Sequence, residues 1–196
     1  FIMSSMPMGV ATSTDAGPHI DTTPLPLPSL PSSTRKSEQG ELGISIASHF
    51  YALSDEELNR RLSDIASLGI TWVRFDIEWG MIQPRSPSDA NWSEVDRLVT
   101  ALNRHDLRML PILAYTPKWA RAAECDYTDK CHPRDPEEFA RFARTAVERY
   151  ASRGINAWEI WNEPNYDAFW KPKADPEGYT KLLQATYLAI KAADPD

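Results

Sequence analysis

Residues 158–165, which read WEIWNEPN, decide the fold of this chain. The run 157–161 is short, apolar and aromatic apart from Glu159, which is typical of a buried strand. A polar loop follows at once and begins with Asn162 and Glu163. Because the functional groups of parallel α/β barrels gather at the carboxyl ends of the strands, this pattern predicts Glu163 as a site carboxylate.

From residue 41 onward, short apolar runs alternate with helical patterns, as a parallel sheet with crossover helices requires. Strands are predicted at residues 42–47, 71–77, 107–114 and 157–161. Helix starts are indicated by a capping box at Ser54 and Glu57 and by the pairs Asp135-Pro136 and Asp175-Pro176. In the last helix, the residues expected to face inward are Tyr179, Leu182, Leu183, Tyr187 and Ile190.

The run WNEPN at residues 161–165 resembles the fourth-strand signature of clan A glycoside hydrolases. These are retaining (β/α)8 enzymes that include cellulases, β-mannanases and the β-xylosidase and α-iduronidase family, glycoside hydrolase family 39. The runs WVRFDIEW at 72–79, YTPKWA at 115–120 and FW at 169–170 are similar to segments of bacterial cellulase-like members close to that family. The resemblance covers roughly residues 41–196.

The pattern and the resemblance together imply the amino-terminal half of a TIM barrel, with one βα unit for each predicted strand. Closure of this fold takes eight strands and typically about 250 residues. Half a barrel leaves open strand edges, so we expect the natural polypeptide to continue beyond residue 196. A complete half-barrel that dimerises is the alternative.

The resemblance also implies roles for three residues of the site. Glu163 is expected to be the general acid/base, and Asn162 the amide that hydrogen-bonds the sugar 2-hydroxyl. Arg74 is expected to contact the nucleophile, a seventh-strand glutamate that lies outside this sequence; a salt bridge to Glu159 is the alternative for Arg74. Among the visible acids, Glu159 lies about 13 Å from Glu163 along the strand, too far for the roughly 5 Å between the carboxyls of a retaining enzyme.

Several rings and a histidine fall just after strands or in the loops beyond them, where they are candidates for stacking on sugar faces. The substrate-binding candidates are His49, Trp79, Tyr115, Trp119, Trp161, Tyr166 and Trp170. Trp79 and Trp119 fit a loop anchor as well as a sugar platform, and His49 fits a surface role as well as a site role.

The net charge of −7 argues against nucleic acid or an anionic membrane as a partner, because both need clustered Lys and Arg. No apolar run approaches the roughly 20 residues of a membrane span. The resemblance implies an oligo- or polysaccharide as the partner. No cofactor is implied, since both catalytic groups of this chemistry are side chains. No metal site is predicted, because the histidines are scattered.

Cys125 and Cys131 flank a polar five-residue segment and are predicted to form a disulfide, with two unpaired thiols as the alternative. A disulfide would fit a secreted or extracellular protein. Residues 1–40 are rich in Pro, Ser and Thr and are predicted to be a disordered arm or linker, whose first residues fit the tail of a signal peptide.

The sequence thus predicts half of a retaining glycoside hydrolase that acts on a β-linked glycan. The main alternative is a non-catalytic carbohydrate-binding relative of the same fold.

Overall fold

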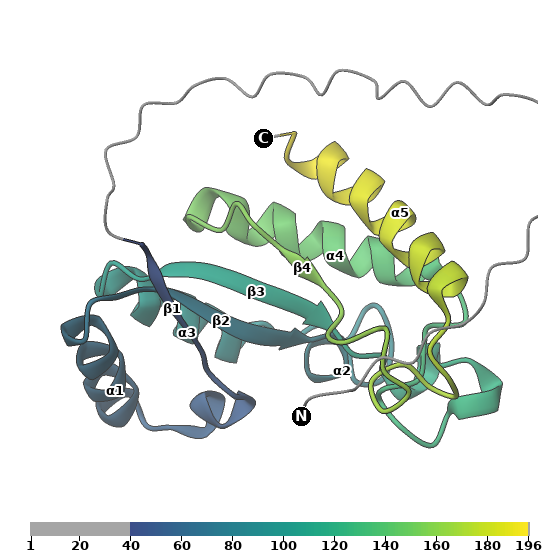
Figure 1. Ribbon diagram of the computed structural model, residues 1–196, viewed down its shortest axis with the longest axis horizontal. Coiled ribbons are helices and arrows are strands. Elements are labelled where there is room, and N and C mark those ends of the chain that lie inside the picture. The colour runs from purple at the N-terminus through teal and green to yellow at the C-terminus, as the bar shows by residue number, and fades with distance from the viewer. Residues whose placement is uncertain (1–39, 196) are drawn as a thin grey trace, which may run out of the picture. The chain divides into compact units, whose positions relative to one another are not determined.

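Four parallel strands form one sheet in the order β1-β2-β3-β4, so each strand lies beside its neighbour in the sequence (Figure 1). The strands are β1 Leu42–Ser45, β2 Ile70–Glu78, β3 Arg108–Ala114 and β4 Glu159–Ile160. The computed structural model describes residues 40–195. The predicted arm, except for its last residue, lies outside the described residues.

Helices connect successive strands and give the βα alternation that the sequence predicts. The α-helices are α1 Asp55–Ser67, α2 Trp79–Ile82, α3 Ser93–Arg104, α4 Pro136–Tyr150 and α5 Pro176–Ala193. Short 3-10 turns are η1 Ser48–Ala52, η2 Lys118–Ala120, η3 Ala123–Cys125 and η4 Ala151–Arg153. The predicted α/β architecture, half of a (β/α)8 barrel, is confirmed. No helix within residues 40–195 is long and apolar enough to cross a membrane.

Side-chain caps fix where the crossover helices begin. The Ser54 hydroxyl accepts a hydrogen bond from the Glu57 backbone N–H at 3.2 Å, as the capping box predicts. Asp135 and Asp175 each accept from the backbone N–H two residues later, at 3.0 and 3.1 Å. A proline then occupies the first turn of α4 and of α5, where it costs no hydrogen bond.

Strand β2 separates an apolar face from a polar one. Val73, Phe75 and Ile77 are buried in the core beneath the helices. The alternate residues, among them Arg74 and Asp76, project from the opposite face and are only partly buried. This second face corresponds to the barrel interior, and it carries the charged groups toward the carboxyl ends of the strands.

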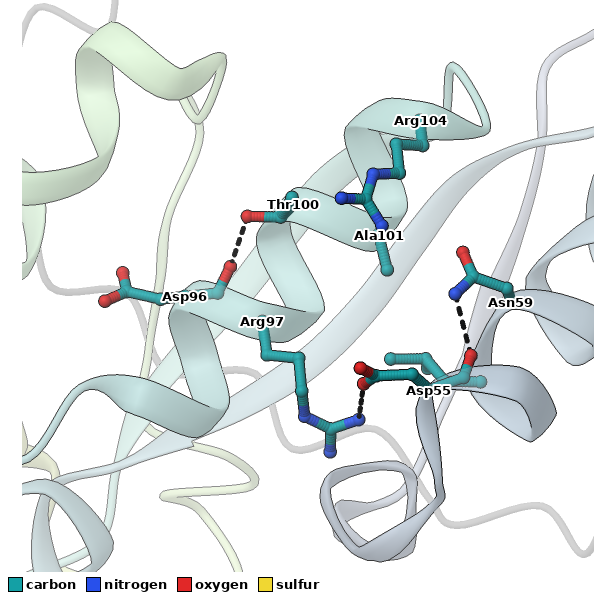
Figure 2. A pocket seen from close by; sticks show the side chains of 8 residues that line it. Asp55, Asn59, Asp96, Arg97, Thr100, Ala101 and Arg104 are labelled. Carbon is teal, nitrogen blue, oxygen red and sulfur yellow. Dashed lines mark hydrogen bonds and ion pairs between the residues drawn. The ribbon is translucent and has the colours of Figure 1, made fainter.

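Helices α1 and α3 are held together by the guanidinium of Arg97 (Figure 2). It donates to Asp55 Oδ1 at 3.2 Å and to the Leu53 carbonyl at 3.0 Å. The hollow beside it, about 230 Å³, is lined by side chains of these two helices. The hydrogen bonds of Arg97 are made within the protein, so we interpret this hollow as part of the polar contact between the two helices and not as a ligand site.

Helix α5 packs beside α4 along a narrower stripe than predicted. Leu182 and Thr186 are buried, but Leu183 and Tyr187 are 39% and 58% exposed. The prediction that Leu183 and Tyr187 face inward is therefore wrong. The apolar pattern of α5 is wider than the surface that α4 presents, so only one row of its side chains is covered.

Candidate active site at the end of strand β4

Strand β4 pairs over two residues, Glu159–Ile160, instead of the predicted 157–161, and the backbone leaves the extended conformation directly after Ile160. Trp161 and Glu163 have φ values of 67° and 48°, in the left-handed region. A bulky side chain is rarely found there, and each such residue costs about 1–3 kcal/mol. The left-handed residues change the direction of the chain. Asn162 and Glu163 therefore turn away from the sheet and do not continue the backbone hydrogen bonds with β3.

Contacts around Trp161 hold this turn in place. Its backbone N–H donates to the Leu113 carbonyl at 2.9 Å, which adds one ladder bond beyond the strand. Its indole N–H donates to the Phe169 carbonyl at 2.6 Å. The ring packs edge-on against Tyr115 and Trp170, with centroids 5.4 and 5.2 Å away. These contacts stabilise the left-handed backbone of Trp161, which a bulky side chain disfavours by itself.

Arg74 connects β2 to the β4 turn. Its Nη2 lies 2.6 Å from Glu159 Oε2, and its Nε lies 2.9 Å from Glu159 Oε1, so the pair is bidentate. The same Nη2 donates to Asn162 Oδ1 at 3.0 Å. Because the amide oxygen of Asn162 faces the guanidinium, its NH2 group faces away and is available as a donor. The structure thus contains the salt bridge to Glu159 that the sequence analysis gives as the alternative role for Arg74.

Tyr115, directly after β3, presents a neutral hydroxyl to this cluster. Burial and then the negative charge of Asp76 raise the pKa of Tyr115 to about 12, and a hydrogen bond with the Asn162 side chain works in the opposite direction. A donor to the phenol oxygen lowers its pKa, which agrees with the Asn162 NH2 group facing Tyr115. Asn162 thus lies between the Arg74 guanidinium, which donates to its amide oxygen, and the Tyr115 phenol.

Two further carboxyls close strand β2. Burial raises the pKa of Asp76 and of Glu78. The positive charges of Arg74 and then Lys130 oppose this rise at Asp76, and that of Lys130 opposes it at Glu78. Lys130 was not among the predicted site residues. It belongs to the loop between Cys125 and Cys131, which the structure joins in a disulfide with a Cα–Cα distance of 5.2 Å. No periodic pattern or motif in the sequence indicates where this lysine points.

Glu163 is exposed and opens onto a pocket of about 580 Å³ at the carboxyl end of β4. The pocket brings together the predicted Glu163, Asn162 and Arg74. Its other lining residues are Glu159, Ile160, Trp161, Pro164, Asn165 and Tyr179. The arrangement offers a solvated carboxyl that can exchange a proton, an oriented amide and a cation.

The structure places several predicted sugar-stacking rings in the core. Trp79 is completely buried and packs against Trp119 and Phe142, with its indole N–H on Gln83 Oε1 at 2.6 Å. Trp170 is 2% exposed and stacks on His132. The assignment of Trp79 and Trp170 to substrate binding is therefore wrong. A position after a strand does not determine on which side of the sheet a ring packs.

The remaining candidates differ in accessibility. Trp161 lines the pocket but is 2% exposed, and Tyr115 is 5% exposed, so neither offers a free ring face. Trp119 is half-buried and donates to the Gln83 carbonyl at 2.8 Å, as a loop anchor does. Tyr166 is 56% exposed in the loop after β4. His49 is exposed in η1, after β1. Tyr166 and His49 keep free surfaces, although neither lines the pocket around Glu163.

The sequence and the fold both match those of known proteins. The profile of Glycosyl hydrolases family 39 matches residues 90–196. This chain belongs to that family. A curated relative, the β-xylosidase of Geobacillus stearothermophilus, is 29% identical over 115 residues, which cover 54% of this family 39 chain and 23% of the relative.

Solved structures of the family share the fold. A monomeric β-xylosidase from Caulobacter crescentus CB15 superposes with a TM-score of 0.65 at 24% identity, over 79% of this chain and 34% of that one. A GH39 enzyme from Xanthomonas axonopodis pv. citri gives a TM-score of 0.64 at 23% identity, over 79% and 33% of the two chains. The family 39 chain therefore spans about a third of the length of these structures.

Proposed function

We propose that this family 39 chain is part of a retaining glycoside hydrolase in which Glu163 is the general acid/base. The observation that carries the proposal is the strained β4 turn, which presents an exposed Glu163 beside an Asn162 that Arg74 holds in one orientation. Strain of this kind is retained where a side chain must be placed for function.

The proposed reaction has two steps. In the first, Glu163 donates its proton to the leaving glycosidic oxygen while a second carboxylate attacks the anomeric carbon and forms a glycosyl ester. In the second, Glu163, now a carboxylate, takes a proton from water, and the water oxygen replaces the ester oxygen at that carbon. Asn162 is proposed to donate an N–H of its side-chain amide to a sugar hydroxyl.

The second carboxylate is proposed to come from a segment outside these 196 residues. Glu159 lines the same pocket, but Arg74 holds both of its carboxylate oxygens in a bidentate pair, so this carboxylate is not free to attack a sugar. Arg74 supports this view, because its Nη1 makes no hydrogen bond with any residue between 40 and 195. A free guanidinium nitrogen at the site is available to a further carboxylate and would keep it ionised.

The proposed substrate is a β-linked oligo- or polysaccharide. The relatives named above are β-xylosidases, so aryl β-xylosides are the first substrates to test. We further propose that the protein is secreted, because the Cys125–Cys131 disulfide persists in oxidising compartments and polymeric glycans lie outside cells.

The test compares Glu163→Gln with the wild type in the natural full-length protein, on aryl β-xylosides of poor and good leaving ability. Loss of the proton donor should slow cleavage of the poor leaving group by about 10²- to 10⁴-fold and that of the good one much less. Glu177→Gln, which changes an exposed glutamate on α5, is the matched control and should cleave both normally. Near-normal turnover of the poor substrate by Glu163→Gln would sink the assignment. Binding without cleavage by the wild type would instead favour a non-catalytic carbohydrate-binding protein.

A further inference from the structure

A lysine of the disulfide loop lies directly against the candidate active site. The Nζ of Lys130 is 3.1 Å from the centroid of the Tyr115 ring, within cation–π range. The same ammonium lies 3.1 Å from Asp129 Oδ2, and the side chain is 25% exposed. A lysine side chain that lies against a ring in this way loses rotamer entropy. The attraction between the ammonium and the ring must offset that loss.

Backbone contacts fix the loop that carries this lysine. The Thr116 N–H donates to the Asp129 carbonyl at 3.0 Å, which ties the loop to the segment after β3. The Lys171 N–H donates to the Lys130 carbonyl at 2.9 Å, which ties it to the segment after β4. The disulfide closes the loop immediately after Lys130. Lys130 is therefore anchored to both strand-end segments that form the site.

Tyr115 lies between Lys130 and the segment that carries Glu163, the proposed acid/base. The ring packs perpendicular to that of Trp161, whose left-handed backbone starts the turn that carries Glu163. The side chain of Asn162, the neighbour of Glu163, opposes the rise in the pKa of the Tyr115 phenol through a hydrogen bond. Lys130 covers the ring face. Movement of Tyr115 would therefore disturb both the turn and the amide.

We propose that Lys130 is a positioning residue, which holds Tyr115 against Trp161 and Asn162 and thereby fixes the position of Glu163. This inference rests on the proposed function and deepens it. Lys130 does not donate a proton in the reaction. Its cation attracts the electron-rich face of Tyr115, and the disulfide loop holds that cation in place.

The activity test uses the natural full-length protein and the aryl β-xylosides named above. Lys130→Met keeps an unbranched side chain one atom shorter and removes its charge. Loss of a partly desolvated cation–π contact predicts a fall of about 5- to 30-fold in kcat/KM, carried mainly by kcat. Lys130→Arg restores a cation and should recover most of the loss. Lys118→Met changes an exposed lysine in η2 and should match the wild type.

A double-mutant cycle separates positioning through Tyr115 from a general role of the loop. In a Tyr115→Leu background, Lys130→Met should lower kcat/KM by less than about 2-fold, because the ring it acts on is gone. Equal losses in the two backgrounds would overturn the inference. So would a wild-type kcat/KM for Lys130→Met in a protein that Glu163→Gln inactivates, and that outcome would leave the proposed function intact.

A second readout does not depend on activity. In protein with ring-labelled tyrosine, the NMR signal of Tyr115 is identified by its loss in Tyr115→Phe. That signal should shift in Lys130→Met and stay in place in Lys118→Met. An unchanged Tyr115 signal in Lys130→Met would overturn the positioning role, whatever the result with Glu163→Gln.

Discussion

Arg74 on β2 reaches Glu159 on β4 across the intervening strand β3, and its Nη2 lies 2.6 Å from Glu159 Oε2. Neighbouring strands lie about 4.8 Å apart, so the two backbones are separated by about 10 Å. Only a long side chain can bridge that gap. The same nitrogen reaches Asn162 at 3.0 Å. One guanidinium thus ties the second strand to the turn that presents Glu163.

Arg74→Met should destabilise the protein, because it leaves the Glu159 carboxylate in a partly buried place without its partner. The two side chains are 32% and 33% exposed, so the expected loss in the free energy of unfolding, about 1–3 kcal/mol, lies between those of exposed and buried pairs. Urea denaturation measures it. The control is Arg85→Met, which removes an arginine that is 82% exposed and should cost under about 1 kcal/mol. Equal losses in the two variants would contradict the structural role of Arg74.

Trp79→Ala should act on stability and not on sugar binding. The ring is fully buried among Trp119, Phe139 and Phe142, and its truncation leaves a large cavity. Truncation of a core tryptophan costs about 3–5 kcal/mol. Thermal unfolding of the variant checks this value. Normal stability combined with weakened glycan binding would return Trp79 to the substrate-binding residues.

The raised pKa of Tyr115 predicts a loss of stability in alkali. The unfolded tyrosine titrates near 10.0 and the folded one at about 12, so the folded state holds the proton more tightly. This contribution is complete below pH 10 and is lost as the pH rises from 10 to 12. The difference between a pKa of 10.0 and one of about 12 corresponds to about 2–3 kcal/mol in the free energy of unfolding. The unfolding free energy of Tyr115→Phe should therefore fall less steeply than that of the wild type over this range. Parallel curves would show that Tyr115 is not linked to folding.

Removal of the disulfide should lower the stability of the loop that carries Lys130. The cysteines are six positions apart, and closing so short a loop in the unfolded chain corresponds to about 2 kcal/mol. The double variant Cys125→Ala/Cys131→Ala should lose about that much in urea denaturation. A reducing agent should produce a similar loss in the wild type and none in the double variant. If a reducing agent destabilised both proteins equally, its effect would not come from this disulfide.

Local signals in the sequence predicted most of the fold. Ser54 and Glu57 form the capping box that their spacing indicates, and α4 and α5 begin at their aspartate-proline pairs. These features depend on hydrogen bonds between residues close in the chain, so a short window contains the whole interaction. The inward face of α5 was predicted less well, because burial of Leu183 and Tyr187 depends on what lies opposite.

The sequence by itself determined the order of strands and helices, the family resemblance and the choice of Glu163, because periodicity and a contiguous motif are properties of neighbouring residues. The tertiary structure alone decided that Trp79 is core, that Trp161 adopts a left-handed backbone, and that Lys130 covers Tyr115. Each of these depends on groups that are distant in the chain. Their contacts outweigh local preferences only after the strands have paired and brought the loops together.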